Sequence, residues 1–480
     1  MTETDHADRP EPTDDVVTSH HTLTTPAGGF SYTATAGRVV LREEVHEDGT
    51  FDGWRPKAQL FVVSYCRDDV DPATRPVTFA FNGGPGSSSI WLHMGLLGPA
   101  RVLMGDAGDL RPPPYGITAN TESLLVHSDL VFIDPVSTGF SRVAEGGKPD
   151  EFHGYQRDID AVGEMIRLWT TRNGRWISPK YLAGESYGTL RAAALASHLQ
   201  RRYSFFLNGI ALISSVLDFG TIRFTEGNDL PYSLFLPTYA CLAHYHGLLG
   251  DRPLAEVRAD AEDLASRDYP YALDRGDRLP SAERDALIQR MSRLTGLSTE
   301  YIDRVDLRIE HKRFFRELLR DRGQIIGRLD GRFTGWDADD GGELPSHDPS
   351  DVAIRGPYAT ALNHHLHTVL GYHSDLPYEV LTDRVQPWSY KEFESRHVSV
   401  ARALSDAMRQ NAHLRVYVAC GYYDGATPYF AAAHALAHLA LPEQLRPQIE
   451  VHHYDAGHMM YGHEPSRLRQ SADLAAFVTG

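Results

Sequence analysis

The chain has 480 residues, of which 42% are hydrophobic and 23% charged, and its formal net charge at pH 7 is -17. This balance is typical of a globular protein and excludes fibrous and wholly disordered chains. The excess of acidic residues disfavours contact with nucleic acid and with anionic membrane surfaces, so we expect neither as a partner. No apolar run reaches the ~18 residues that a membrane helix needs.

The N-terminal segment and the cysteines indicate a reducing compartment. No apolar segment of the secretory type follows Met1, and the three cysteines are too few and too far apart for a disulfide framework. We therefore expect a cytoplasmic protein, unless a cleaved precursor segment is missing from this sequence. Residues 1–20 are acidic and contain proline, and their composition predicts a disordered tail.

The first half of the chain alternates between strand and helix patterns. Short runs of β-branched and aromatic residues that end in turn-forming residues predict strands at residues 39–41, 60–63, 77–81, 131–133, 180–183 and 209–213. Apolar residues at helical spacing predict a helix at 155–169, and good helix formers predict another at 190–196. This alternation indicates an α/β fold, with a mostly parallel sheet covered on both faces.

The pattern changes between residues 220 and 394. Charge-rich helical stretches dominate there, at residues 254–266, 281–294 and 311–322, and strand signals are few. The strand and helix rhythm resumes at residues 414–419, 429–439, 449–451 and 466–478. We therefore expect a catalytic core of residues 21–219 and 395–480, interrupted by a mainly helical cap insertion of residues 220–394.

Ser186 lies at the centre of a G-x-S-x-G pattern, residues 184–188, between a predicted strand and a predicted helix. This context is the one that a nucleophile elbow requires. Neighbours without side chains allow the tight turn, and the backbone N–H of Tyr187 is placed to donate to a developing oxyanion. The alternative is a chance Gly-Ser turn without chemistry.

A serine nucleophile needs a base, and in folds with this elbow the acid and the histidine follow the serine in the chain. Asp424 follows the strand at 414–419, and His458 follows the strand that begins at Ile449. Both positions are strand ends, where sheet-edge sites are built. Asp455 is a rival acid, and the poorer alternatives for the histidine are His452, His453 and His463.

A second glycine-rich turn, NGGPGSS at residues 82–88, follows the strand at 77–81. It lacks the Gly-Lys-Ser/Thr of a phosphate-binding loop, and it fits better a loop whose backbone N–H groups form the other half of an oxyanion hole. Residues 337–342 superficially resemble a calcium loop, but the twelfth position is Asp348 instead of glutamate. We expect neither a metal nor another cofactor.

Several motifs together resemble those of the serine carboxypeptidase family. They are the two glycine turns, the sequence GHM at residues 457–459, DPVSTGFS at 134–141 and LGP at 97–99. The resemblance extends over residues 58–215 and 395–480, and in the insertion it concerns position only. It implies an α/β-hydrolase fold that releases C-terminal residues from peptide substrates by acyl transfer to a serine.

The resemblance also implies a role for each matching residue. Ser186 is then the nucleophile, His458 the general base and then acid, and Asp424 the residue that orients the imidazole. The backbone N–H groups of Gly84 and Tyr187 form the oxyanion hole, while Asn82 and Glu185 bind the free α-carboxylate of the peptide. Two carboxyl groups can pair only when one is protonated, so we expect stronger peptidase activity at acidic than at neutral pH.

Three positions depart from the family pattern. Ala80 stands where the family often has tryptophan, and Leu96 where it often has a glutamate that pairs with the glutamate of the elbow. Ser87 replaces a usual cysteine, in agreement with a compartment without disulfides. The first two departures leave the implied triad intact and remove contacts from the carboxylate receptor.

Two other functions remain open at this point. One is an esterase or acyltransferase on the same scaffold, and the other is a catalytically silent binding or protective protein. Intact residues at positions 186, 424 and 458 disfavour the silent protein. The sequence does not fix the oligomeric state, and it leaves a homodimer open.

Overall fold

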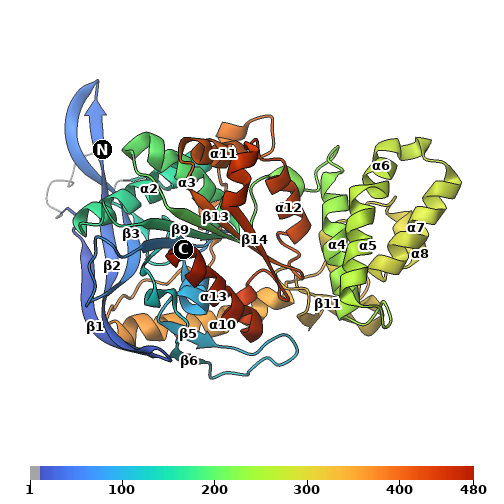
Figure 1. The fold of residues 1–480 in the computed structure, drawn as a ribbon, viewed down its shortest axis with the longest axis horizontal. Coiled ribbons are helices and arrows are strands. Elements are labelled where there is room, and N and C mark those ends of the chain that lie inside the picture. Colours follow the sequence, from blue (N-terminus) through green and yellow to red (C-terminus); the bar gives the residue numbers. More distant parts are fainter. Residues whose placement is uncertain (1–10, 146) are drawn as a thin grey trace, which may run out of the picture.

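The computed structural model describes residues 11–145 and 147–480. Within these residues ten strands form one central sheet, in the order β1-β2-β3-β7-β4-β9-β10-β13-β14, with β8 paired to β3 (Figure 1). Neighbours from β7 to β14 are parallel, and β1, β2, β3 and β7 are joined by antiparallel pairing. The strands are β1 Asp15–Thr25, β2 Gly28–Glu47, β3 Thr50–Arg67, β4 Val77–Phe81, β7 Asp129–Ile133, β8 Arg142–Val143, β9 Lys180–Glu185, β10 Gly209–Ile213, β13 Arg415–Gly421 and β14 Ile449–Tyr454.

Helices cover both faces of this sheet. Successive side chains of a buried strand point to opposite faces, so each face needs an apolar cover. In β4, Phe79 and Phe81 belong to one apolar cluster and Ala80 to the other. The first cluster includes α2 Tyr155–Arg172, α3 Tyr187–Tyr203, α11 Ala401–Gln410 and α12 Tyr429–Ala437. The second includes α1 Ile90–Leu92, α10 Pro349–His364 and α13 Glu464–Thr479. The predicted α/β architecture is therefore confirmed.

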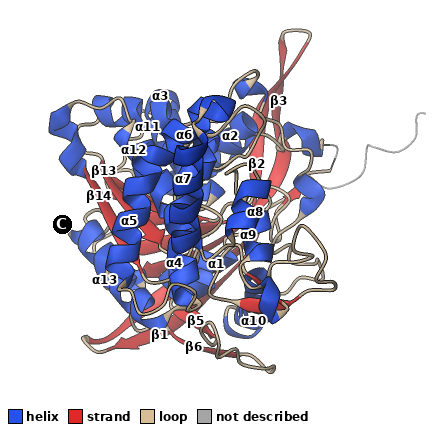
Figure 2. Cartoon of the chain, turned by 90° about the vertical axis from the view of Figure 1, so that its right-hand side faces the viewer, coloured by secondary structure: helices blue, strands red, loops and turns tan. Residues whose placement is uncertain are grey.

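A helical cap projects from the core at the right of Figure 1. It contains α4 Leu230–Tyr245, α5 Leu254–Ser266, α6 Asp268–Arg275, α7 Ser281–Thr295, α8 Thr299–Arg304 and α9 His311–Glu317. Figure 2 shows α4, α5 and α7 side by side in front of the sheet, and each packs on another through buried leucines and alanines. The cap contacts the core at α12, where Tyr429 Oη donates to Glu262 Oε1 at 2.8 Å.

The predicted extent of the cap, residues 220–394, is wrong in its last third. Helix α10 lies on the core, where Tyr358 packs on Trp91 with ring centroids 5.0 Å apart. Residues 379–389 then pair with Ser87, Gly139 and Gly154 through isolated bridges. The apolar positions of α10 are spaced for one buried face, and the sequence alone does not show which surface that face covers. Two short hairpins complete the fold: β5 Ala100–Leu103 with β6 Gly116–Ala119, and β11 Gln324–Ile326 with β12 Thr334–Trp336.

The predicted disordered tail is also wrong in part. Residues 1–10 lie outside the described residues, but Asp15–Thr25 form β1, paired along its whole length with β2. β1 is an edge strand whose side chains are almost all exposed or half-buried, so its polar composition resembles that of a flexible segment. Its β-branched residues, Val16, Val17, Thr18, Thr22 and Thr24, were the signal for a strand.

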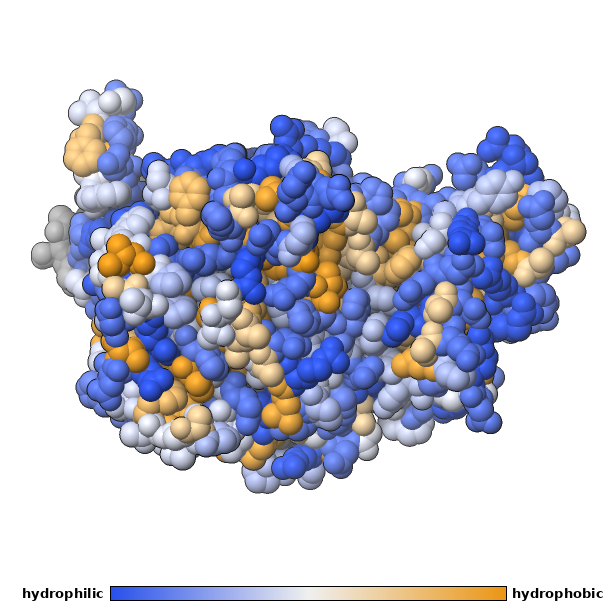
Figure 3. All heavy atoms as spheres, viewed as in Figure 1, coloured by the Kyte–Doolittle hydropathy of each residue, from blue (hydrophilic) through white to orange (hydrophobic). Residues whose placement is uncertain are grey.

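The surface in Figure 3 is mainly hydrophilic, and apolar residues appear there in small separate groups. Such scattered groups are normal on a protein surface and do not mark a docking face. Among the helices of the described residues, none has the length and apolar character that a membrane span requires.

Candidate active site

Ser186 occupies a strained turn between β9 and α3. Its backbone has φ 60° and ψ -128°, a conformation that costs a non-glycine residue about 1–3 kcal/mol. Gly184 and Gly188 make this turn possible. A Cβ on Gly184 would lie 2.1 Å from the carbonyl oxygen of Gly188, and one on Gly188 would lie 2.8 Å from that of Phe81. The G-x-S-x-G pattern is therefore a steric requirement of the local packing.

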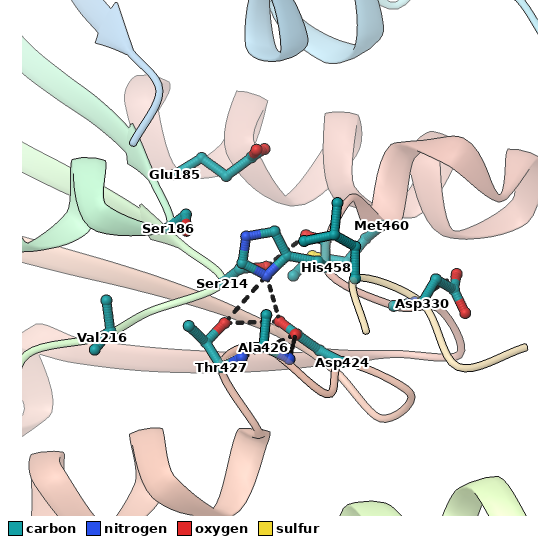
Figure 4. A network of polar contacts seen from close by, with 12 residues as sticks. Glu185, Ser186, Ser214, Val216, Asp330, Asp424, Ala426, Thr427, His458 and Met460 are labelled. Atoms are coloured by element: carbon teal, nitrogen blue, oxygen red, sulfur yellow. Dashed lines mark hydrogen bonds and ion pairs between the residues drawn. The ribbon is translucent and has the colours of Figure 1, made fainter. Parts of the chain in front are cut away.

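His458 and Asp424 meet at the ends of neighbouring strands β14 and β13. His458 Nδ1 donates to Asp424 Oδ2 at 2.8 Å, and the carboxyl group is fully buried. Asp424 also accepts hydrogen bonds from the backbone N–H of Ala426 at 2.7 Å and from the hydroxyl of Thr427 at 2.7 Å. Figure 4 shows the imidazole between this carboxylate and Ser186. Such a ring has one nitrogen fixed by an acid and the other free to accept a proton.

The hydroxyl of Ser186 makes no hydrogen bond to the imidazole among the contacts of the described residues. It lies on the side of the ring away from Asp424 (Figure 4). Catalytic hydrogen bonds are often long before substrate binds, so this geometry fits an unliganded site. Burial lowers the pKa of His458 and the Asp424 carboxylate raises it, and the net result lies above the usual value of 6.5.

The rival residues lie elsewhere. Asp455 is exposed, whereas His458 bonds to Asp424. His452 approaches Asp473 at 3.3 Å, His453 stacks on Tyr422, and His463 Nδ1 bonds to Ser466. The three cysteines are free, and burial raises the pKa of each to about 12, so a cysteine thiolate is no competitor to Ser186 at neutral pH.

The glycine turn after β4 packs directly on the elbow. A Cβ on Gly83 would lie 2.4 Å from the backbone nitrogen of Tyr187, so only glycine fits there. Gly84 follows with φ +102°, a conformation that favours glycine. The turn therefore brings its own backbone N–H groups close to that of Tyr187, as an oxyanion hole of two donors requires.

Asp134 stabilises the loop that follows this glycine turn. Its Oδ1 accepts from the backbone N–H and the hydroxyl of Ser89, at 2.8 and 2.7 Å, and its Oδ2 accepts from Tyr378 Oη at 2.9 Å. Burial raises the pKa of Asp134 to about 6, while the donors from Ser89 and Tyr378 oppose that rise. The DPVSTGFS segment thus has a structural role, to fix the loop that follows the glycine turn.

Asn82 and Glu185 are joined, as their neighbouring strands β4 and β9 place them. Asn82 Nδ2 donates to Glu185 Oε1 at 2.9 Å, and both residues are buried. Asn82 is itself fixed by two contacts: Leu92 N–H donates to its side-chain oxygen, and Arg191 donates to its backbone carbonyl oxygen. Arg191 is in turn paired with Asp158 at 2.7 Å, inside the core.

Tyr461 supplies the second contact to Glu185. Its hydroxyl donates to Glu185 Oε2 at 2.5 Å, and the ring is buried beside the elbow. Burial raises the pKa of Glu185 to about 7, while His458, Tyr461 and Asn82 act to lower it. Glu185 is thus close to half-protonated near neutral pH. This chain has Leu96 where the family often has a glutamate that pairs with the elbow glutamate, and here the Tyr461 hydroxyl bonds to Glu185.

These groups line one cavity of about 580 Å³. Its wall includes Asn82, Gly84, Glu185, Ser186, Tyr187 and His458, together with aromatic side chains from the core and residues of α4, α9 and α10. The seven residues singled out in the sequence therefore converge on one place, with Asp424 directly behind His458. No group of three or more potential metal ligands occurs within the described residues.

Four contributors were not found from the sequence. Thr427 bonds to Asp424, Tyr461 bonds to Glu185, and Ser214 and Leu329 fix the backbone of His458 at 2.5 and 2.6 Å. Tyr461 lies three residues after His458, and this proximity was the available signal. Leu329 belongs to the predicted cap and gave none.

Known proteins are similar to this chain in sequence and in fold. The serine carboxypeptidase family model matches residues 47–284. Serine carboxypeptidase-like 45 of Arabidopsis thaliana is 24% identical over 180 residues, which are 36% of this chain and 36% of that protein. The lysosomal protective protein of Mus musculus is 27% identical over 183 residues, 38% of this chain and 34% of that protein. The aligned part thus spans about a third of the length of these curated relatives.

The fold agrees over most of the chain. The crystal structure of a prohormone-processing carboxypeptidase from Saccharomyces cerevisiae has a TM-score of 0.55 and 15% identity, and the match covers 93% of this chain and 91% of that one. At this identity the likeness shows the α/β-hydrolase fold. The matching family model and the curated relatives support the serine carboxypeptidase family for this chain, and the solved structure agrees with its fold.

Proposed function

We propose that the protein is a serine-type carboxypeptidase that releases C-terminal residues from peptides through an acyl-enzyme. The observation that carries this proposal is the buried Asn82–Glu185 pair next to Ser186. The serine and the imidazole alone support acyl transfer in general. A buried carboxyl group with a pKa of about 7 adds a group that, when protonated, donates to a free carboxylate.

The proposed reaction begins when Ser186 Oγ attacks the carbonyl carbon of the last peptide bond. His458 Nε2 takes the hydroxyl proton, while Asp424 holds the ring and stabilises its positive charge. The backbone N–H groups of Gly84 and Tyr187 donate to the oxyanion of the tetrahedral intermediate. His458 then protonates the leaving amino group, and water, activated by the same imidazole, releases the remaining peptide from Ser186.

Replacing Asn82 by alanine tests the carboxylate receptor. We expect kcat/KM for free-acid peptides to fall about tenfold to a hundredfold, because the substrate's charged carboxylate loses the amide that hydrogen-bonds to it. The same peptides with an amidated C-terminus, and simple esters, should change little. The control is Asn208→Ala, because Asn208 directly precedes β10, at the end of the parallel strands opposite the active site. Equal losses on acids and esters in the Asn82 variant would favour an esterase or acyltransferase.

Tyr461→Phe tests the electrostatics of the same receptor through its pH profile. The receptor requires protonated Glu185, so the affinity for free-acid peptides should decline as pH rises through about 7. The Tyr461 hydroxyl stabilises the ionised form, and its removal should raise the pKa of Glu185 and move this alkaline limb to higher pH. The pH profile of ester hydrolysis should be the same in Tyr461→Phe and in the parent protein, because an ester has no free carboxylate for Glu185 to bind.

A matched control separates this effect from the loss of any buried hydroxyl. Tyr454→Phe also removes a buried phenol, which bonds to Tyr417 and Asp473 and does not touch Glu185. It should leave the pH profile in place. An unchanged alkaline limb in Tyr461→Phe would show that Glu185 does not control carboxylate binding.

A further inference from the structure

Two arginines without an ion pair among the described residues line the cavity, and one of them, Arg223, lies on the side of Ser186 away from the Asn82–Glu185 pair. In the sheet, β9 lies between β4 and β10. Asn82 follows β4, Ser186 follows β9, and the loop that holds Phe219 and Arg223 follows β10. A peptide whose C-terminal carboxylate sits at Asn82 and Glu185 therefore extends its acyl part toward Arg223. This step, and the proposal below, rest on the proposed function.

Arg223 and Arg328 are exposed to the cavity, and neither takes part in an ion pair among the described residues. Arg223 lies over the ring of Phe219, with its guanidinium carbon 5.1 Å from the ring centroid. Arg328 follows β11 and is fixed through its backbone N–H, which donates to Asp348 Oδ1 at 3.0 Å. The guanidinium of Arg223 is thus positioned by Phe219 and the backbone of Arg328 by Asp348, and neither guanidinium group forms an ion pair among the described residues.

His311 of α9 is the common neighbour of the two arginines. It also lines the cavity and stacks on Phe235, with centroids 5.4 Å apart. Burial lowers the pKa of His311 to about 3, with further lowering by Arg328, Lys312 and Arg223. The imidazole is therefore neutral at working pH.

No acidic residue among the described residues forms an ion pair with either arginine. Asp351 is paired with Arg355 at 2.6 Å, Glu310 lies 3.2 Å from His311 and caps α9, and Asp348 is occupied by backbone and hydroxyl donors at the start of α10. Asp383 is the remaining free carboxylate of the cavity wall, on the segment beside Gly86. Asp348, Asp351 and Asp383 also line the cavity, so the two arginines are distinguished by guanidinium groups without an ion pair and not by the net charge of the wall.

We propose that Arg223 and Arg328 form a specificity site for an anionic side chain upstream of the scissile bond, so that peptides with Glu or Asp in the penultimate position are the preferred substrates. The guanidinium groups would receive the side-chain carboxylate in charge-assisted hydrogen bonds. The aliphatic part of the substrate side chain would pack on Phe219 and Phe235. Binding energy at this site positions the scissile carbonyl and should appear in kcat/KM.

The test is a competition between three blocked dipeptides that share a C-terminal leucine and differ in the penultimate residue, Glu, Gln or Lys. The ratio of kcat/KM values from one mixture does not depend on the fraction of active enzyme. We expect Glu to exceed Gln about tenfold at low ionic strength, and the advantage to shrink with added salt. The double variant Arg223→Gln/Arg328→Gln should bring the ratio to about one, and Arg223→Glu/Arg328→Glu should favour Lys.

Arg384→Gln is the matched control, because this exposed arginine pairs with Glu379 and does not line the cavity. It should retain the preference for Glu. Release of leucine with no discrimination between Glu and Gln would overturn the specificity site and leave the carboxypeptidase proposal standing.

A second readout does not depend on peptide cleavage. N-acetylglutamate should protect Ser186 from a fluorophosphonate probe better than N-acetylglutamine, and the double glutamine variant should lose the difference. Equal protection by the two compounds in the unaltered enzyme would contradict the site. If the enzyme cleaves no peptide and N-acetylglutamate still protects Ser186 better than N-acetylglutamine does, the proposed carboxypeptidase function fails and the anion site stands.

Discussion

Replacing Ser186 by alanine should lower kcat/KM for peptides by about 10⁵-fold to 10⁶-fold, because the nucleophile is lost while the rest of the site remains. The side chain contributes little to the fold. It is one hydroxyl at a turn that the glycines and the backbone hydrogen bond from Ser186 N–H to Ile213 already define. Thermal unfolding of the variant should match that of the parent protein.

The double variant Ser186→Ala/His458→Ala makes this prediction specific. Residues that act as one catalytic unit are strongly non-additive, so removing the base from an enzyme without its nucleophile should cost almost nothing further. The measurement is single-turnover hydrolysis of an activated ester, with labelling by a fluorophosphonate as the readout of the serine. A serine variant that keeps more than a few per cent of activity would assign the chemistry to another residue.

Asp424→Asn should lower kcat by about 10⁴-fold, because an amide at this position no longer fixes the imidazole tautomer or stabilises its cation. The buried carboxylate accepts from His458 Nδ1 and from three further donors of residues 426 and 427. Substrate binding, read from the affinity for a non-hydrolysable product analogue, should change much less than kcat.

Asp455→Asn is the matched control for this variant. Asp455 is three residues from His458 in the chain, but its side chain is exposed and the acid that bonds to His458 is Asp424. We expect Asp455→Asn to keep more than half of the parental activity. A large loss in this variant, or a small one in Asp424→Asn, would reverse the assignment of the acid.

Much of the core was predictable because strong local patterns determine it. The buried strands β4, β9, β10 and β13 are short apolar runs that end in turn residues, and each matches a predicted strand within one or two residues. The site was predictable for the same reason, since its residues follow strand ends in motifs with steric requirements. Glycines 83, 184 and 188 have no space for a side chain.

The parts that were missed depend on contacts between distant segments. An exposed edge strand such as β1 carries few apolar residues, and its stability comes from pairing with β2. The location of α10 depends on which surface covers Tyr358, and the contact of Tyr461 with Glu185 depends on how the turn after His458 folds back. The cytoplasmic location and the homodimer stay predictions.

The most direct measurement of the central claim is mass spectrometry of a defined peptide library, digested at several pH values with the parent protein and with Ser186→Ala. The carboxypeptidase account predicts ladders that shorten one residue at a time from the C-terminus, fastest below about pH 7 where Glu185 is protonated. C-terminally amidated copies should resist, and the serine variant should produce no ladder. Internal cleavage, or cleavage of amidated and free-acid peptides at equal rates up to pH 9, would contradict it.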